Sequence, residues 1–261
     1  MGATILADGV PEVMKAVREN FKAHASQIKI MAGGGISSMY DPLVNVQYTL
    51  EEMKAAVEEA TRWSTYVLVH AMIDKAVEMS LDAGVKSIDH GTVILKKNIK
   101  RMAKDGVWLV PTAFLILQDV ETNPNFTTPE KQKVAKSVQE GQKQTLKWAK
   151  QYGVKIGWGT DAFASRAAYD RMMNEFPARA PYFTNVEQLQ QITGNNGELV
   201  AMAGEMSPYK DGPLGVIQPG AYADLLIVEG NPLEDIEVMV DYENNFKLIM
   251  KDGKVYKNTL K

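Results

Sequence analysis

Apolar residues along this chain alternate between two spacings, and the alternation predicts a regular succession of helices and strands. From Val10 to about Ala25 they recur every three or four residues, as on the buried face of a helix. Residues 27–32 then form a short apolar run typical of a buried strand. The same order returns further along, with strands expected at residues 66–70, 85–90, 107–111 and 154–158.

Capping signals mark the helices between these strands. Residues 49–52 open a helix with the pattern of a capping box, and later helices are expected from about residue 73, over 96–104 and over 129–152. These three later helices each end at a glycine directly before a strand: Gly84, Gly106 and Gly153. Because strands and helices alternate strictly, the strands should form a parallel sheet, either doubly wound or closed into a barrel.

The pattern changes after about Ser207. A turn is expected at residues 215–220, a strand at 223–228, and a hairpin that joins 246–250 to 254–256 across Asp252 and Gly253. The sequence therefore predicts two domains, an α/β domain over residues 1–206 and a small β appendage over residues 207–261.

Charge and composition exclude several classes of partner and chemistry. The formal net charge is −3, and Lys and Glu are evenly interleaved, so we expect neither nucleic acid nor a membrane surface as a partner. No apolar run approaches the roughly 20 residues of a membrane span. With no cysteine, the chain has no disulfide, thiolate nucleophile or Cys-ligated metal, and its compartment stays open.

Polar residues stand where the predicted strands end. His70 and His90 close two strands, Asp161 follows a third, and Lys29 lies inside a fourth on the face opposite its isoleucine neighbours. Side chains from several strand ends converge on the site of a (β/α)₈ barrel, so a barrel is favoured over a doubly wound sheet. Singly, each residue has an ordinary interpretation as a structural histidine, a helix cap or a solvated lysine. Inside a barrel, however, an unpaired ammonium would cost several kcal/mol.

Other candidates are weaker. The run of three glycines at residues 33–35 lacks the spacing of a phosphate-binding loop, which argues against a nucleotide-binding domain. His24 has no partner in this scheme and is expected at the surface. Arg166 and Arg171 follow Asp161 and could bind a substrate carboxylate, but helix-surface charges are the preferred interpretation.

Short motifs are spread over the whole chain: 28–34 (IKIMAGG), 47–49 (QYT), 69–71 (VHA), 88–91 (IDHG), 159–161 (GTD), 214–217 (LGVI), 219–226 (PGAYADLL) and 230–233 (GNPL). Together they resemble the imidazolonepropionase-like amidohydrolases, and within these the branch of Xaa-Pro dipeptidases (prolidase-like) and acyl-amino-acid carboxypeptidases. The resemblance implies the later five βα units of a TIM-type (β/α)₈ barrel, with a small C-terminal β-sandwich appendage.

The resemblance also implies a binuclear divalent metal site, usually zinc. Lys29 would be an N-carboxylated lysine, whose amine takes up carbon dioxide to become an anionic carbamate ligand. His70 and His90 would bind one metal. Asp161 would bind the other and act as general base for the metal-activated water that attacks an amide carbonyl. Met72 stands where many relatives carry a polar or aromatic residue, which predicts a different specificity.

One part of the family pattern is missing. The first strand of these enzymes carries a His-x-His motif for the second metal, and the three histidines here, His24, His70 and His90, do not form one. The chain alone is therefore expected to hold at most one metal. Five parallel strands would also leave sheet edges, to be covered by a homo-oligomer or by a missing N-terminal segment of another or a longer polypeptide.

Two hypotheses follow. The first is a metal-dependent hydrolase that cleaves the peptide or amide bond of small dipeptides or N-acyl amino acids, with a small-molecule substrate as its main partner. The second is a non-catalytic partial barrel, or a subunit, that keeps the metal ligands by descent. Bound metal without turnover would favour the second.

Overall fold

A computed structural model describes residues 4–36, 38, 40–121, 123, 126–162 and 166–260. It divides into two compact units, which are described separately. The first holds Met1–Pro111, Val120–Ile156 and Met202–Pro208, and the second holds Thr112–Asp119, Gly157–Ala201 and Tyr209–Lys261. The domain boundary expected at residue 207 stays a prediction. Among the described residues, no helix is long and apolar enough to cross a membrane.

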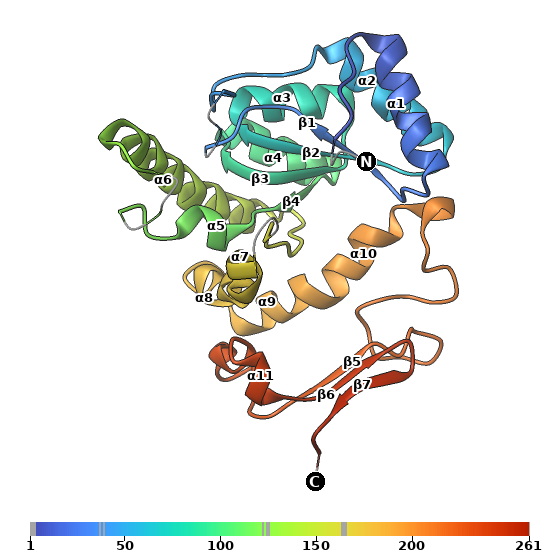
Figure 1. Cartoon of the computed structure of the whole chain (residues 1–261), viewed down its shortest axis with the longest axis vertical. Coiled ribbons are helices and arrows are strands. Elements are labelled where there is room, and N and C mark those ends of the chain that lie inside the picture. Colours follow the sequence, from blue (N-terminus) through green and yellow to red (C-terminus); the bar gives the residue numbers. More distant parts are fainter. Residues whose placement is uncertain are drawn as a thin grey trace. The chain divides into compact units, whose positions relative to one another are not determined.

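The first unit is an alternation of helices with a four-stranded parallel sheet of order β1-β2-β3-β4 (Figure 1). Its strands are β1 (Ile28–Met31), β2 (Val67–Ile73), β3 (Ser87–Val93) and β4 (Trp108–Val110). Its helices are α1 (Val10–Lys22), α2 (Leu50–Arg62), α3 (Asp74–Ala83), α4 (Lys96–Asp105), α6 (Pro129–Tyr152) and the short η3 (Gly204–Met206). The predicted α/β succession is confirmed up to β4.

Local sequence signals set the helix ends as expected. Thr49 caps α2 in a complete capping box with Glu52. Gly84, Gly106 and Gly153 end α3, α4 and α6 in left-handed conformation, which glycine adopts without a Cβ penalty. The predicted strand at residues 154–158 differs, because only Ile156 forms an isolated parallel bridge there.

Strand register separates the core from the polar face of the sheet. Ile30, Val69, Ile88 and Leu109 are in register and buried. Because side chains alternate between faces along a strand, Lys29, His70 and Asp89 emerge on the other face. The alternating burial of β1, with Lys29 and Met31 exposed, follows this pattern. The predicted orientation of Lys29, opposite its isoleucine neighbours, is confirmed.

The second unit joins short helices to a three-stranded antiparallel sheet of order β5-β6-β7. The strands are β5 (Leu225–Val228), β6 (Phe246–Lys251) and β7 (Lys254–Asn258), which include the predicted hairpin. The helices are α5 (Ala113–Leu117), α7 (Arg166–Asp170), η1 (Met172–Asn174), α8 (Glu175–Arg179), α9 (Asn185–Gln190), the π-helix η2 (Gln191–Asn195), α10 (Asn196–Ala201), η4 (Ile236–Met239) and α11 (Tyr242–Asn245).

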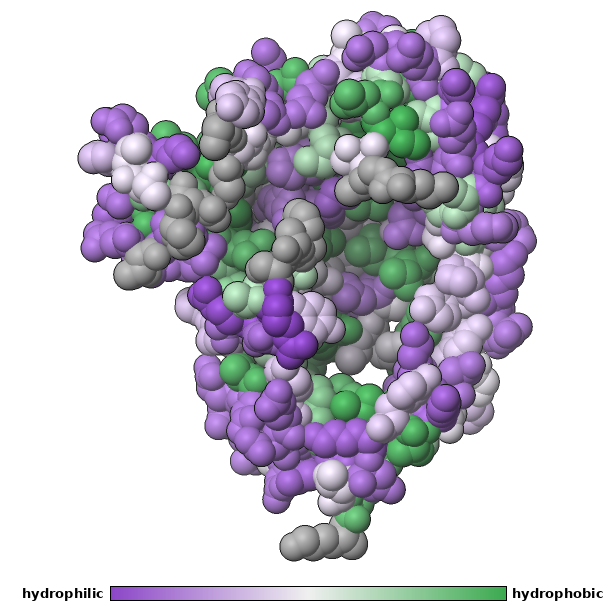
Figure 2. Space-filling view, viewed as in Figure 1, coloured by the Kyte–Doolittle hydropathy of each residue, from purple (hydrophilic) through white to green (hydrophobic). Residues whose placement is uncertain are grey.

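A small apolar core supports this sheet. It consists of Phe176, Ile236, Met239 and Phe246, packed against partly buried neighbours. Within the described part of residues 207–261 there is one sheet, whereas a β-sandwich has two. On the visible face of the molecule, hydrophilic residues cover most of the outer surface (Figure 2).

Candidate functional site

His70 and His90 lie on adjacent parallel strands of the first unit. In the pairing of β2 with β3, His70 is opposite Asp89 and Ala71 is opposite His90. The two imidazole ring centroids are 4.6 Å apart. His90 has a φ of 69°, a left-handed conformation that is rare outside glycine. Strained backbone of this kind is concentrated at functional sites, so the observation supports a role for His90.

Lys29 is not an isolated ammonium. Its Nζ lies 2.8 Å from Oδ2 of Asp89, with the lysine side chain 43% exposed and the aspartate side chain 12% exposed. The expected problem of an unpaired buried cation therefore does not arise in the structure. Asp89 was visible in the sequence only as part of a motif, although it is in register with His70. The structure adds it to the candidate site.

Burial and charge control the protonation of this cluster. Burial lowers the pKa of His90 to about 3, and the nearby charges of His70 and Lys29 act in the same direction. Burial raises the pKa of Asp89, and the Lys29 ammonium opposes that rise. His90 is thus neutral at pH 7, with a nitrogen lone pair to donate. His70 Nε2 lies 3.3 Å from the carbonyl oxygen of Gly34, which accepts only if Nε2 carries the proton.

These side chains partly fit a divalent cation. Across the described ranges, no three His, Asp or Glu side chains converge as a ligand set. Two imidazoles are together, and neutral imidazole suits zinc. An ammonium has no lone pair, so Lys29 could become a third ligand only after conversion to an anionic form such as the carbamate. The first-unit cluster of Lys29, His70, Asp89 and His90 therefore fits one metal on that condition.

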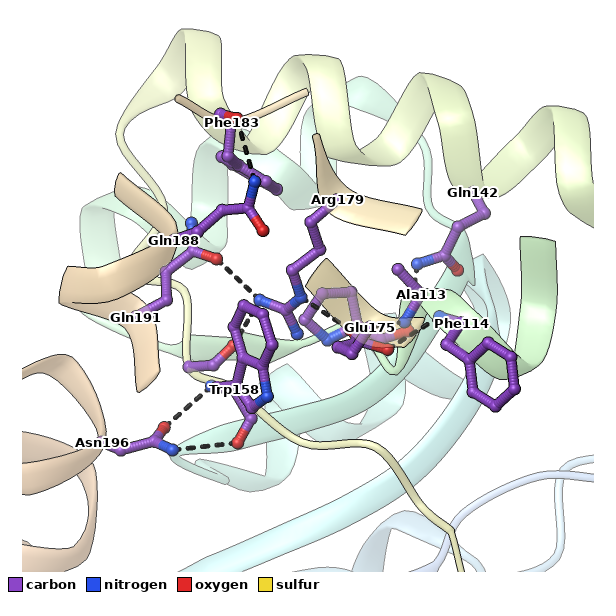
Figure 3. Close-up of polar contacts among 12 residues, drawn as sticks. Ala113, Phe114, Gln142, Trp158, Glu175, Arg179, Phe183, Gln188, Gln191 and Asn196 are labelled. Atoms are coloured by element: carbon purple, nitrogen blue, oxygen red, sulfur yellow. Dashed lines mark hydrogen bonds and ion pairs between the residues drawn. The ribbon is translucent and has the colours of Figure 1, made fainter. Parts of the chain in front are cut away.

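Asp161 lies in the second unit. Its φ is 52°, again the left-handed region in a residue with a Cβ. Trp158 lies three residues before Asp161 in the chain. Its N–H donates to Asn196 Oδ1 at 2.8 Å, and its carbonyl accepts from Asn196 Nδ2 at 3.0 Å (Figure 3). Arg179 Nη1 donates to the Gly157 carbonyl at 3.0 Å.

The remaining candidates take ordinary places. His24 is exposed, as predicted. Arg166, 81% exposed, pairs with Asp170 of the same helix, which fits a helix-surface charge. Arg171 packs over the ring of Phe114, with 5.1 Å between the guanidinium carbon and the ring centroid. Gly34 has a structural reason to be glycine, because a Cβ there would overlap the carbonyl group of Pro42.

Sequence comparison finds matches over nearly the whole chain. The profile of the Amidohydrolase family matches residues 1–256. Ochratoxinase from Aspergillus niger is 28% identical over 260 residues, which make up 98% of this chain and 51% of the relative. The chain thus spans about half the length of the curated relatives it matches.

Solved structures also match nearly the whole of this chain. A prolidase complexed with N-methylphosphonate-L-proline matches with a TM-score of 0.86 and 35% identity, over 97% of this chain and 60% of that chain. A Xaa-Pro dipeptidase with methionine bound in its active site matches with a TM-score of 0.81 and 29% identity, over 99% and 62%. The α/β fold with a parallel and a small antiparallel sheet is common to these matches.

Proposed function

The chain belongs to the amidohydrolase family, as its motifs predicted, and on this premise we propose that it carries part of the active site of a metal-dependent amide or peptide hydrolase. The observation that carries the proposal is the first-unit cluster on neighbouring parallel strands, where two imidazoles meet beside Lys29 and Asp89. The strands β2 and β3 each continue three residues beyond the histidines that were predicted to end them. Convergence of polar side chains from several strand ends is how barrel enzymes build their sites.

The ligands follow from the chemistry of the side chains. His70 and His90 would hold one divalent cation, with zinc favoured by imidazole ligands. The Lys29 carbamate would be a further ligand, and Asp161 would serve a second cation. When bound, a divalent cation polarises the substrate carbonyl and makes water a nucleophile at neutral pH. Asp161 would accept the proton of the attacking water and return it to the leaving amine.

Carboxylation of Lys29 would use the geometry of its ion pair. The reaction forms a bond between Nζ and the carbon of carbon dioxide and releases a proton, so it starts from the neutral amine. Asp89 stabilises the ammonium and opposes the reaction, but its carboxylate, 2.8 Å away and with a raised pKa, is also placed to accept a lysine proton. The lysine side chain is 43% exposed, so its ammonium can be hydrated when it leaves the pair, whereas the Asp89 carboxylate stays largely buried.

Small dipeptides or N-acyl amino acids are the proposed substrates. The named relatives support this class, because one binds N-methylphosphonate-L-proline, another binds methionine, and a third is an ochratoxinase. The first two ligands are amino acids or their derivatives. Met72, two residues after His70 on β2, is buried. An apolar residue at this position favours a specificity different from that of relatives with a polar residue there.

A second candidate is a non-catalytic module or a subunit. The sequence lacks a His-x-His motif, Lys29 is paired with Asp89 rather than free for carbon dioxide, and the chain spans about half of its curated relatives. In that case the metal ligands remain by descent, and activity would need a second copy or a separate N-terminal segment.

Metal content and turnover of the purified chain separate these candidates. Zinc per chain would be measured by elemental analysis, together with hydrolysis of a panel of N-acyl amino acids and Xaa-Pro dipeptides. His70→Asn and His90→Asn should lose zinc, whereas His24→Asn, which alters the exposed histidine, should keep it. Zinc with turnover supports the hydrolase, and zinc without turnover supports the non-catalytic module. Equal zinc in all variants would refute the first-unit cluster as a metal site.

A further inference from the structure

Two consecutive residues of β3 both reach the first-unit cluster. Asp89 pairs with Lys29, and the ring centroid of His90 lies 4.6 Å from that of His70. In a regular strand, successive side chains point to opposite faces of the sheet. Asp89 is in register with His70 and shares its face, so regular geometry would place His90 on the face of its own partner, Ala71. The strand therefore departs from regular geometry at His90.

The departure is a β-bulge directly after His90. Between the pairs Ala71–His90 and Ile73–Val93, β3 has two residues where β2 has one. The first residues of the bulge are left-handed, with φ of 69° at His90 and 51° at Gly91. A bulge bends its strand and re-aims the side chains on it, and bulges are frequent next to active sites. Here the bulge accounts for an imidazole that faces the histidine of β2.

A chain of hydrogen bonds holds the bulge. Thr92 Oγ1 donates to the Met72 carbonyl oxygen at 2.8 Å, which ties the bulged part of β3 to β2. Thr145 Oγ1 of α6 donates to the Thr92 carbonyl oxygen at 3.2 Å and accepts from the Ile94 N–H at 3.3 Å. Thr92 and Thr145 are 0% and 1% exposed, so water cannot replace these bonds. Buried polar groups of this kind are costly to leave unpaired.

Helix α6 reaches the bulge because it carries a glycine where it packs against β3. A Cβ on Gly141 would lie 3.0 Å from the Thr92 carbonyl oxygen and 2.6 Å from Cγ2 of Val93. A larger residue would push the helix away from the strand. The approach of α6 is thus close enough for Thr145, one turn further along the helix, to bond the main chain of β3 directly.

We propose that Thr92 and Thr145 are positioning residues, which hold the bulge of β3 and thereby keep the His90 imidazole beside that of His70. Both hydroxyls bond main-chain groups, so they act through the backbone and not on a ligand. The inference rests on the proposed function, because a metal site at the first-unit cluster needs both imidazoles in one place.

The test uses Thr145→Val, which keeps the size and branching of the side chain and removes its hydroxyl. Thr145→Ser restores the hydroxyl. Thr65→Val is the matched control in the same unit, because Thr65 is also buried and its hydroxyl also donates to a main-chain carbonyl, that of Ser26, at 2.6 Å.

The placement of the imidazoles can be measured without any metal. The chain has three histidines, so the ring signals of His70 and His90 can be separated, with the exposed His24 as a reference. In the full chain treated with a chelator, the nuclear Overhauser contact between the two rings reports their distance. Amide hydrogen exchange at Ile94 reports its bond to Thr145, and the melting temperature reports the stability of the fold.

Thr145→Val should lose the contact between the two rings and speed amide exchange at Ile94 by about fivefold, as for one lost hydrogen bond. Thr145→Ser should restore both. Thr65→Val should keep the ring contact, although it also lowers the melting temperature. If Thr145→Val does not fold, Thr92→Val, which removes the bond to Met72, is judged by the same ring contact.

Two results would overturn the inference. If Thr145→Val keeps the ring contact and lowers only the melting temperature, Thr145 has a purely structural role. If Thr65→Val loses the contact as well, the loss reflects a general loosening of the first unit. Both results leave the proposed function standing, which fails separately if His70→Asn and His90→Asn bind as much zinc as the native chain.

Discussion

The ion pairs Lys29–Asp89 in the first unit and Glu175–Arg179 in the second are both short, at 2.8 and 2.6 Å, but their environments are opposite. Lys29 is 43% exposed, whereas neither side chain of the second pair is exposed at all. In the first pair the cation can be hydrated when the contact opens, while the Asp89 carboxylate, 12% exposed, stays largely buried. A fully buried pair is costly to form and more costly to break. The first pair can therefore exchange partners, as chemistry at Lys29 would require, and the second is a fixed part of the fold.

The largest expected effect comes from breaking the buried pair. Arg179→Met removes the cation and leaves the Glu175 carboxylate buried without its counter-ion, which should lower the free energy of unfolding by about 3 to 5 kcal/mol. The measurement is urea unfolding followed by circular dichroism. Arg166→Met is the control, since it removes the cation of an exposed pair with Asp170 and should have almost no effect. Equal stability of both variants would contradict the contrast between buried and exposed pairs.

The ion pair Arg18–Glu59 joins an exposed arginine to a buried carboxylate, and it should make the stability of the fold depend on pH. Glu59, itself buried, accepts from Arg18 at 2.9 Å and from Arg62 at 3.0 Å, and these bonds, led by that of Arg18, lower the pKa of Glu59 to about 2. Because the folded pKa is below the ordinary value of 4.5, the contribution to stability is complete above pH 4.5 and is lost as the pH falls toward 2.

Glu59→Gln should therefore be less stable than the native chain at pH 7 and lose less stability between pH 7 and pH 3. Urea unfolding at the two pH values measures both differences. Glu58→Gln, at an exposed position of the same helix, should keep the native pH dependence. An unchanged pH dependence in Glu59→Gln would show that the arginine contacts do not control this carboxylate.

The smallest expected effect concerns the half-exposed pair. Asp89→Asn removes the carboxylate that favours the Lys29 ammonium. We expect the fraction of Lys29 carbamate at a fixed bicarbonate concentration to rise by about fivefold, as for the loss of roughly 1 kcal/mol of ion-pair stabilisation. Carbon-13 NMR with labelled bicarbonate would measure the carbamate. A lower carbamate fraction in Asp89→Asn would mean that Asp89 assists carboxylation more than it opposes it.

Sequence patterns predicted much of the first unit because its elements depend on local signals. Helix α6 begins and ends where the pattern of Pro129 and Gly153 indicated, and Lys29 lies on the predicted face of β1. The strand expected at residues 154–158 is reduced to one isolated bridge at Ile156. Strand formation depends on a partner strand of matching length and register, which the sequence of the segment does not reveal. Most short helices between residues 113 and 201 carried no recognisable periodicity and were not predicted.

For the candidate site, the sequence by itself predicted Lys29, His70, His90 and Asp161 as metal ligands, because motif spacing is a local property, and these roles stay predictions. Only the tertiary structure decided that Asp89 neutralises Lys29, since that contact depends on the register between strands far apart in the chain. It also decided the network of Glu175, Arg179 and Asn196. In a sequence these residues look like ordinary helix-surface positions. Glu175 and Arg179 are buried by the packing of the second unit, and Asn196 follows a π-helix that the sequence pattern did not predict.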